Sequence, residues 1–359
     1  MNGGRVMVVL NLLINNDCNL NCPYCYVNSV NASGDNGGAE RIKVSDIDRI
    51  MKDLHQDDIS AVHIFGGEPF LHPKLKEICR IFHDYTIPVN IATNATIVEP
   101  HIPWLHKQQV SISVNLFGNQ DIVELLQYEY PINKVLYNTR IMVETGLDVT
   151  GIYPVFQARE NAKKTAEFYF DTIKETHDQT GVDNYFLLYL SKLGRAKDNW
   201  KTIKTELYRP DNWLLFLKML QMKLRKERVP FSIYAEPAFE SSHIFFEVPP
   251  EAIQCDLLIR QNLVLDYNMD MYPCILVRAL NEASRGIKYN GDINALINRF
   301  NDMQANFITD NAQVCRSCKQ LMYCCPCVPY IQDSMKDYRC SSKDKQGTLM
   351  GCPLVTVKL

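Results

Sequence analysis

The chain has 359 residues, of which 46% are apolar and 22% charged, and its formal net charge is −3 at pH 7. These are ordinary globular values, so a sizeable core can be buried. No long run of lysine or arginine stands out, and we expect no nucleic-acid partner. The longest apolar run near the start, residues 6–14, is too short to span a bilayer and lacks the flanks of a signal peptide. We therefore expect a cytoplasmic protein with no membrane partner.

Short apolar runs alternate with helical patterns over the first two-thirds of the chain. Strands are expected at residues 6–14, 61–65, 89–93, 110–115, 149–155 and 185–190, and helices near residues 45–55, 73–84, 133–145, 162–176 and 211–228. Continuous β-branched runs between helices are typical of parallel strands buried on both faces. Periodicity alone fits either a partial (β/α) barrel or an open doubly wound sheet.

Thirteen cysteines are the anomaly of the composition. Three lie within residues 18–25, Cys79 stands alone in an apolar helical setting, and nine fall between Cys255 and Cys352. A cytosolic chain uses such clusters for metal more often than for disulfides. For Cys79 we expect a buried structural thiol. The βα alternation ends near Phe231, so we expect a first domain over residues 1–230, including a linker helix, and a smaller Cys-rich domain over residues 231–359.

The first group, Cys18, Cys22 and Cys25, directly follows the first strand with the spacing C-x3-C-x2-C. Iron–sulfur clusters are usually held by four thiolates, so a cube held by three leaves one iron open to another ligand. The alternative is a structural zinc site, which needs a fourth cysteine or histidine, and none is evident nearby.

Four segments in chain order resemble the radical S-adenosylmethionine superfamily. Tyr24 precedes the last cysteine of the motif; residues 65–69 read FGGEP at the end of the second expected strand; residues 93–95 read TNA where the family has TNG; and residues 111–115 read SISVN, with Asn115 in an acidic position of the family. The resemblance implies a partial (β/α)6 barrel and a [4Fe–4S] cluster that binds S-adenosylmethionine through Cys18, Cys22 and Cys25.

The resemblance also implies a set of cofactor-contacting residues. Gly66 and Gly67 allow close backbone approach, and Glu68 offers its carboxylate to the ammonium group of the methionine moiety. The short polar side chains of Asn94, Ser113 and Asn115 suit the ribose hydroxyls and the carboxylate of S-adenosylmethionine. A segment at residues 194–196, GRA, resembles one branch of the superfamily, although an ordinary loop is an equal alternative. The expected contacts are Tyr24, Gly66, Gly67, Glu68, Pro69, Thr93, Asn94, Ser113, Asn115 and Arg195.

The C-terminal cysteines resemble a SPASM domain, a module that carries auxiliary iron–sulfur clusters. Residues 266–274 match its opening, except that Met269 replaces a turn glycine, and Cys315-x2-Cys318-x5-Cys324 matches its central spacing. The resemblance implies two auxiliary [4Fe–4S] clusters. The first is held by Cys255, Cys274 and Cys327, with its last iron open or closed by Cys325 or Cys352. The second is held by Cys315, Cys318, Cys324 and Cys340. A zinc ribbon is the alternative.

These resemblances imply an enzyme that makes a 5′-deoxyadenosyl radical and abstracts a hydrogen atom from its substrate. Relatives with this domain act most often on peptides, so we expect an oxidoreductase that crosslinks or otherwise matures a ribosomally made peptide. It would need an electron donor such as flavodoxin or ferredoxin. Because only five residues precede the first strand, leader recognition would need a separate leader-peptide-binding protein or another surface. A dehydrogenase or epimerase acting on a small metabolite, a sulfatase maturase and a non-catalytic zinc-binding module are the alternatives.

Overall fold

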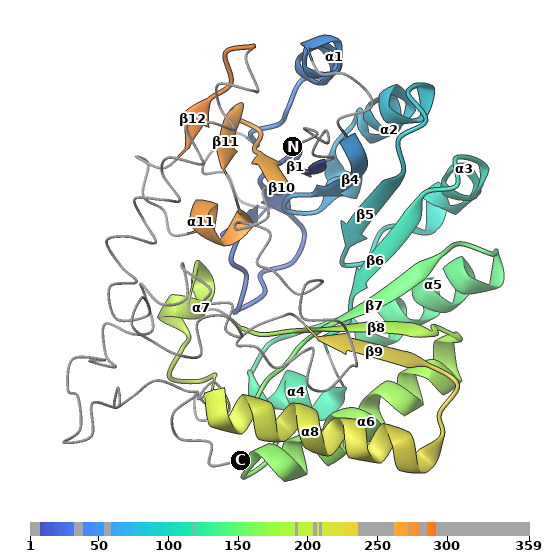
Figure 1. Ribbon diagram of the computed structural model, residues 1–359, viewed down its shortest axis with the longest axis vertical. Coiled ribbons are helices and arrows are strands. Elements are labelled where there is room, and N and C mark those ends of the chain that lie inside the picture. Colours follow the sequence, from blue (N-terminus) through green and yellow to red (C-terminus); the bar gives the residue numbers. More distant parts are fainter. Residues whose placement is uncertain are drawn as a thin grey trace, which may run out of the picture.

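The computed structural model describes residues 8–31, 39–53, 59–117, 119–190, 193–203, 207, 210–235, 262–272, 274–279 and 286–291. Within these ranges a ten-stranded sheet forms the body of the protein, and a small two-stranded sheet lies beside it (Figure 1). The small sheet pairs β2 (Asp17–Cys18) with β3 (Val30–Asn31). It therefore brackets the segment that contains the first cysteine motif.

The large sheet is mainly parallel. From edge to edge its strands are β12 (Ile287–Lys288), β11 (Asp270–Tyr272), β10 (Asn262–Leu265), β1 (Val8–Leu13), β4 (Ile59–Phe65), β5 (Val89–Thr93), β6 (Ser111–Asn115), β7 (Val149–Pro154), β8 (Asn184–Leu188) and β9 (Ser232–Ala235). Neighbours from β10 to β9 are parallel, whereas β11 and β12 are antiparallel. All the parallel strands consequently present their carboxyl ends at one edge of the sheet.

Helices connect the strands of the large sheet. They are α1 (Val44–Asp53), α2 (Leu75–Asp84), α3 (Ile102–Lys107), α4 (Gln120–Leu125), α5 (Ile132–Glu144), α6 (Ala162–Thr180), α7 (Arg195–Asp198), α8 (Pro210–Glu227) and α11 (Ile275–Ala279), with 3-10 turns η2 (Pro69–Leu71) and η3 (Glu99–His101). In Figure 1 the longer helices follow one another around one side of the sheet, from α1 through α2, α3 and α5 to α6 and α8. Cover on one side is the arrangement of a barrel wall rather than of a doubly wound sheet.

The core lies between this sheet and its helices. Leu12, Val62, Ile64, Ile91 and Ile112, from four adjacent strands, are fully buried. Such β-branched and leucine side chains fit a parallel strand because both of its faces are covered. The central strands are therefore rigid supports for the loops at their carboxyl ends.

Local signals define the longest helix, α6. The side chain of Asn161 accepts a hydrogen bond from the backbone N–H of Lys164 at 3.0 Å, which caps the amino end. The helix ends at Gly181, whose φ of +74° is the left-handed conformation that glycine adopts without strain. One face of α6 packs on α8, and together they close the sheet below β8 and β9.

The six strands expected from the sequence are confirmed, as β1, β4, β5, β6, β7 and β8, and so are the five expected helices. Two further parallel strands, β9 and β10, were not expected. Both lie beyond residue 230 and continue the same sheet. The division at residues 230 and 231 stays a prediction, because most of the second domain falls outside the described residues.

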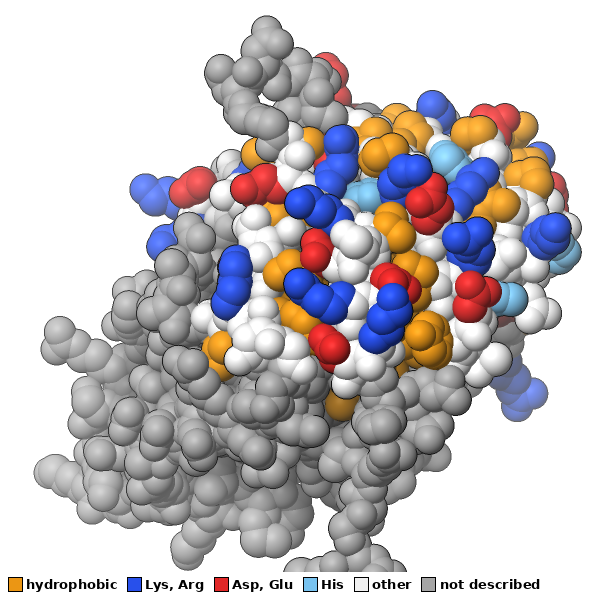
Figure 2. Space-filling view, turned by 90° about the horizontal axis from the view of Figure 1, so that it is seen from above, with side chains coloured by type: hydrophobic (Ala, Val, Ile, Leu, Met, Phe, Trp, Pro, Cys, Tyr) orange, Lys and Arg blue, Asp and Glu red, His pale blue; other side chains and the backbone are white. Residues whose placement is uncertain are grey.

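Acidic and basic side chains are interspersed on the face seen from above in Figure 1, as Figure 2 shows for the described part of it. Lys52 pairs with Asp48 at 2.6 Å, and Lys74 pairs with Glu77 at 2.6 Å, both on exposed helix surface. Such exposed pairs contribute little to stability, because water and salt screen their charges. In the described part of the chain, no helix combines the length and the apolar character needed to cross a membrane.

Candidate functional site

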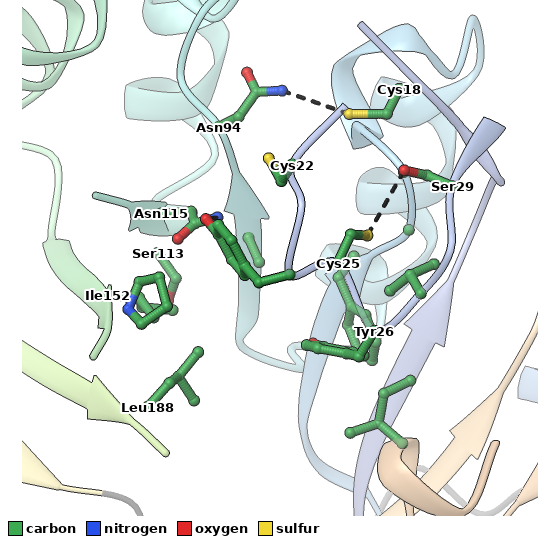
Figure 3. A pocket seen from close by; sticks show the side chains of 18 of the residues that line it. Cys18, Cys22, Cys25, Tyr26, Ser29, Asn94, Ser113, Asn115, Ile152 and Leu188 are labelled. Atoms are coloured by element: carbon green, nitrogen blue, oxygen red, sulfur yellow. Dashed lines mark hydrogen bonds between the residues drawn. The ribbon is translucent and has the colours of Figure 1, made fainter. Parts of the chain in front are cut away.

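A cavity of about 360 Å³ lies at the carboxyl ends of the parallel strands. Every parallel strand from β10 through β8 contributes to its wall, either by its last residues or by the loop that follows. Figure 3 shows the three cysteine side chains on one side of this space and Ile152 and Leu188, from β7 and β8, on the other. Loops at this end of a parallel barrel are where such folds place their chemistry.

Cys18, Cys22 and Cys25 all line the cavity. They carry thiols rather than disulfides, and burial raises the pKa of Cys18 to about 12 and that of Cys22 to about 11. No three His, Cys, Asp or Glu side chains of the described ranges are arranged to hold a single metal ion. The structure thus brings the three predicted ligands to one space without converging them on one point.

Gly66 and Gly67 hold the chain that leads into the cysteine motif. The Gly67 N–H donates to Asn15 O at 2.9 Å, and the Glu68 N–H donates to Asp17 O at 2.8 Å. A Cβ on Gly67 would lie 2.0 Å from the carbonyl oxygen of Asp17, and one on Gly66 would lie 2.5 Å from that of Asn15. Both glycines also line the cavity. Because they have no side chain, their backbone can lie close to residues 15–17 on one side and to a ligand in the cavity on the other.

Glu68 is completely buried behind these glycines. Its carboxylate accepts hydrogen bonds from the Thr93 hydroxyl at 2.9 Å and from the backbone N–H groups of Asn94 at 2.9 Å and Phe70 at 3.2 Å. Burial raises the pKa of Glu68 to about 7, and the three hydrogen bonds counteract only part of that rise. A carboxylate in this position is stabilised by any cation that comes within reach.

The segment after β5 is bound to both the cysteine motif and Glu68. Asn94 donates from Nδ2 to Asn19 Oδ1 at 2.9 Å, and the same group lies 3.8 Å from Cys18 Sγ (Figure 3). Ala95, which stands where the resembling family has glycine, has a φ of +57°. Its carbonyl oxygen accepts a hydrogen bond from Asn138 at 2.6 Å. The backbone at position 95 therefore has the left-handed conformation that the family's glycine would supply.

Asn115 and Ser113 project into the cavity from β6 (Figure 3). Asn115 donates from Nδ2 to the Tyr24 hydroxyl at 2.9 Å, while its Oδ1 is buried and has no hydrogen-bond partner. Tyr24 itself is wedged between Phe117 and Phe156, with ring centroids 5.3 Å apart in both pairs. The unpartnered Oδ1 of Asn115 can accept a hydrogen bond from a ligand, for example from a sugar hydroxyl.

Arg195, the first residue of α7, binds the cysteine loop, the segment between β2 and β3 that carries Cys22 and Cys25. Its guanidinium donates to Cys22 O at 2.9 Å and to Ser29 O at 2.7 Å, and its backbone N–H donates to Cys25 O at 3.0 Å. Gly194 lies so close that a Cβ there would be 2.4 Å from Cys25 O. Arg195 lines the cavity, but its described hydrogen bonds bind the protein's own loop.

Cys274 lines the same cavity as the first cysteine motif. The β10–β11 hairpin places it, because Asp266, at the end of β10, forms a buried ion pair with Arg278 of α11 at 3.1 Å. Met269, in the hairpin turn, has a φ of +62°, a left-handed conformation that favours glycine. The other predicted auxiliary-cluster ligands, Cys255, Cys315, Cys318, Cys324, Cys325, Cys327, Cys340 and Cys352, lie outside the described residues.

Several residues that support the site were not singled out by sequence reasoning. Asp17 is buried and pairs with Arg41 at 2.6 Å, and Asn15 donates to Asp17 Oδ1 at 2.9 Å. The hydroxyl of Tyr128 lies 3.6 Å from Cys22 Sγ. Asn15 and Asp17 adjoin the cysteine motif and could have been suspected from that position. Tyr128, 106 residues from Cys22, follows no recognisable pattern.

The donor set fits an iron–sulfur cluster with an organic cofactor beside it. Thiolates are the ligands that iron–sulfur clusters take in proteins, and three line one wall. Asn115, whose amide oxygen has no hydrogen-bond partner, lines the same cavity, and the buried carboxylate of Glu68 is hydrogen-bonded to Thr93 and Asn94, which also line it. These groups match an ammonium group and a hydroxyl group in a single ligand.

Sequence comparisons find a family and relatives that match part of the chain. Residues 12–171 match the family described as the Radical SAM superfamily. A probable GTP 3′,8-cyclase of Pyrococcus abyssi is 31% identical over 93 residues, which are 26% of this chain and 29% of that protein. A probable GTP 3′,8-cyclase of Thermoplasma volcanium is 29% identical over 119 residues, 32% of this chain and 35% of that protein. The chain thus matches about a third of the length of these relatives.

Solved structures share the fold at low identity. The structure of Streptococcus suis SuiB bound to S-adenosylmethionine has a TM-score of 0.66 at 15% identity and covers 89% of this chain and 72% of that chain. The structure of histidine-tagged anSMEcpe with bound AdoMet has a TM-score of 0.57 at 16% identity and covers 89% of this chain and 84% of that chain. SuiB bound to the precursor peptide SuiA has a TM-score of 0.60 at 15% identity over 80% of this chain and 62% of that chain. Residues 12–171 of the chain are thus similar to the Radical SAM superfamily, and the chain shares its fold with these solved structures.

Proposed function

We propose that Cys18, Cys22 and Cys25 hold the [4Fe–4S] cluster that a radical SAM domain implies, and that S-adenosylmethionine binds beside it in the cavity. The observation that carries this proposal is the position of the three thiols at one cavity wall, with Glu68 buried behind it. When bound, these cofactors supply an electron and a 5′-deoxyadenosyl radical for hydrogen abstraction. The protein's own residues bind, orient and shield them.

Each cofactor contact has a supporting feature. Glu68 offers a carboxylate whose burial favours pairing with an ammonium group. Asn115 offers its unpartnered Oδ1 to a ribose hydroxyl, with Ser113 beside it on the same strand. The backbone of Gly66 and Gly67 lines the cavity without side chains. Tyr24 and Arg195 act mainly on the cysteine loop and β6, through the contacts described above.

We further propose that the substrate is a ribosomally made peptide that is oxidatively matured. Apolar side chains of Ile152 and Leu188 line the cavity opposite the cysteines (Figure 3), and Ile275 also lines it, so the cavity has apolar wall for an uncharged side chain. Cys274, a proposed ligand of the first auxiliary cluster, lines the same cavity as the first cysteine motif, which supports a role beside the proposed radical site. The fold shared with SuiB, which binds a precursor peptide, supports this choice. The C-terminal cysteines would hold the two auxiliary clusters, and an electron donor of the flavodoxin or ferredoxin class would reduce the enzyme.

A small-metabolite substrate is the second candidate. The relatives that match part of the chain include probable GTP 3′,8-cyclases, which favours an enzyme that acts on a nucleotide or another small molecule.

Anoxic purification and mass spectrometry test the radical site. The Cys22→Ala variant should lose the iron of one cluster and form no 5′-deoxyadenosine from S-adenosylmethionine and dithionite. The matched control is Cys79→Ala, whose thiol is buried in α2 outside the cavity and which should keep both properties. Formation of 5′-deoxyadenosine by Cys22→Ala at the wild-type rate would overturn the assignment.

Substrate choice is tested with the same assay. Peptides encoded by short reading frames beside the gene should accelerate 5′-deoxyadenosine formation and leave with a mass lower by two hydrogens or a multiple of two. If GTP accelerates 5′-deoxyadenosine formation and is itself converted, while no peptide does so, the small-metabolite proposal replaces the peptide proposal.

A further inference from the structure

Tyr128 lies in the loop between α4 and α5, outside every motif that the sequence offers. Its hydroxyl oxygen is 3.6 Å from Cys22 Sγ and also accepts the backbone N–H of Asn21 at 3.2 Å. A cysteine that ligates iron is a thiolate and carries no hydrogen. In that state the hydrogen between Tyr128 and Cys22 can come only from the tyrosine hydroxyl.

Packing fixes the direction of this hydroxyl. The Tyr128 ring contacts Phe117, with centroids 5.4 Å apart, and Tyr130, with centroids 6.4 Å apart. The Tyr128 backbone N–H donates to Val123 O at 3.2 Å, which ties the residue to α4. The ring contacts and the backbone hydrogen bond thus both hold the Tyr128 side chain, so its hydroxyl lies beside Cys22 without any rearrangement.

The other two thiols have polar partners of the same kind. Cys18 Sγ accepts the backbone N–H of Leu20 at 3.4 Å and lies 3.8 Å from Asn94 Nδ2, while Cys25 Sγ lies 3.7 Å from the Ser29 hydroxyl. Each sulfur of the motif therefore has its own side-chain neighbour. For Cys22 that neighbour comes from a remote part of the chain.

We infer that Tyr128 is a positioning residue that donates a hydrogen bond to the Cys22 thiolate and thereby raises the reduction potential of the cluster. The inference rests on the proposed function, in which Cys22 ligates that cluster. Reduction takes [4Fe–4S]²⁺ to [4Fe–4S]⁺ with one electron from a donor of the flavodoxin or ferredoxin class. No proton moves, and Tyr128 stays protonated. The added negative charge spreads onto the sulfurs, and hydrogen bonds to those sulfurs stabilise the reduced state.

The test is a potentiometric titration of the anoxic, fully reconstituted enzyme, followed by electron paramagnetic resonance and without S-adenosylmethionine. Cys22→Ala identifies which signal belongs to this cluster. Tyr128→Phe removes only the hydroxyl, so the reduction potential of the cluster should fall. At a fixed solution potential, the ratio of reduced to oxidised cluster should drop by up to about tenfold, which corresponds to ~59 mV for one electron. Tyr130→Phe is the control, because its hydroxyl donates to Asn115 O at 2.8 Å in the same ring cluster. Its potential should match the wild type.

Replacement of Tyr128 by 3-fluorotyrosine gives a test of opposite sign. A more acidic phenol is a stronger donor, so the potential should rise. A wild-type potential in both Tyr128 variants, or an equal shift in Tyr130→Phe, would overturn the inference and leave the proposed function standing. Wild-type protein with no cluster signal that depends on Cys22 would overturn both.

Discussion

Arg195 donates from Nε to the backbone carbonyl oxygen of Cys22 at 2.9 Å, although 173 residues separate them in the chain. The same guanidinium donates to Ser29 O at 2.7 Å, so one planar fork binds two carbonyl oxygens of the segment between β2 and β3. Only arginine presents several donors in a rigid plane, and hydrogen bonds from a charged donor contribute about 1.5–3 kcal/mol each. The clamp therefore stabilises the loop conformation before any cofactor binds.

Arg195→Lys should leave the fold intact but lower the iron content after anoxic reconstitution. A lysine ammonium keeps the charge but cannot satisfy two carbonyl oxygens in the arginine geometry. We expect a loss of roughly 10- to 150-fold in affinity for the cluster at the first motif, corresponding to 1.5–3 kcal/mol. The measurements are iron per chain and the circular dichroism spectrum. Lys197→Gln, on the exposed face of the same short helix, is the control, and equal iron in all three proteins would contradict the clamp.

Gly67→Ala should destabilise the folded state strongly. The new Cβ would lie 2.0 Å from the Asp17 carbonyl oxygen, a backbone atom that cannot move aside like a side chain. We expect the free energy of unfolding to fall by roughly 3 kcal/mol, at the upper end for overpacking. The comparison is Gly146→Ala, where φ is +81° but a new Cβ would lie 3.7 Å from its nearest neighbour, a His106 side-chain atom. That variant should lose only about 1–2 kcal/mol from left-handed strain. Urea unfolding of both variants decides, and similar losses would show that the contact with Asp17 is unimportant.

The regular part of this fold was predictable because its signals are local. Residues 89–93 form the expected strand, and the others differ by a few residues at their ends. β9 and β10 escaped prediction for a physical reason. Each has only four residues, and β10 is a strand because it pairs with β1, about 250 residues earlier. No local pattern records such a pairing.

The candidate site was predictable to the extent that its residues lie in short motifs. The cysteines, Gly66, Gly67 and Asn115 were identified in this way, and the structure places them around one cavity. The role of the glycines against Asn15 and Asp17, and that of Tyr128 against Cys22, depend on contacts between distant segments. Such contacts become visible only once the strands are assembled.

Ala95 gives a prediction about the departure from the family's glycine. Its φ of +57° is strained for alanine by about 1–2 kcal/mol, whereas glycine adopts it freely. Ala95→Gly relieves that strain but loses a buried methyl group and adds freedom to the unfolded chain, about 0.8 and 0.5–1 kcal/mol. The free energy of unfolding should therefore change by less than about 1 kcal/mol.

Ala95→Val is the matching variant. A β-branched side chain is excluded from left-handed backbone more severely than alanine, and position 95 is fully buried. The loss should exceed about 3 kcal/mol, from strain and overpacking together. Calorimetric melting of both variants measures the difference, and a valine variant as stable as the glycine one would mean that this backbone relaxes.

Glu68 predicts how stability depends on pH. Burial raises its pKa in the folded state from 4.5 to about 7, so folding favours the protonated form. The contribution of this group is fully present below pH 4.5 and is lost as the pH rises through 7, by about 3 kcal/mol in total. Glu68→Gln should remove this decline. The amide N–H₂ of the glutamine would face an N–H group that now donates to the carboxylate. Glu68→Gln should therefore be less stable than the wild type at about pH 5, and the difference in the free energy of unfolding should narrow by about pH 8.

Binding of S-adenosylmethionine should report on the same proton. If the ammonium group pairs with Glu68, the pKa of the carboxyl falls in the complex, and a fraction of a proton is released on binding between about pH 6 and 8. Isothermal titration calorimetry of the cluster-loaded enzyme in buffers of different ionisation enthalpy measures that release. The Glu68→Gln variant should bind more weakly and release less. Equal proton release by both proteins would place the ammonium group elsewhere in the cavity, because no other buried carboxylate lies among the contacts proposed for it.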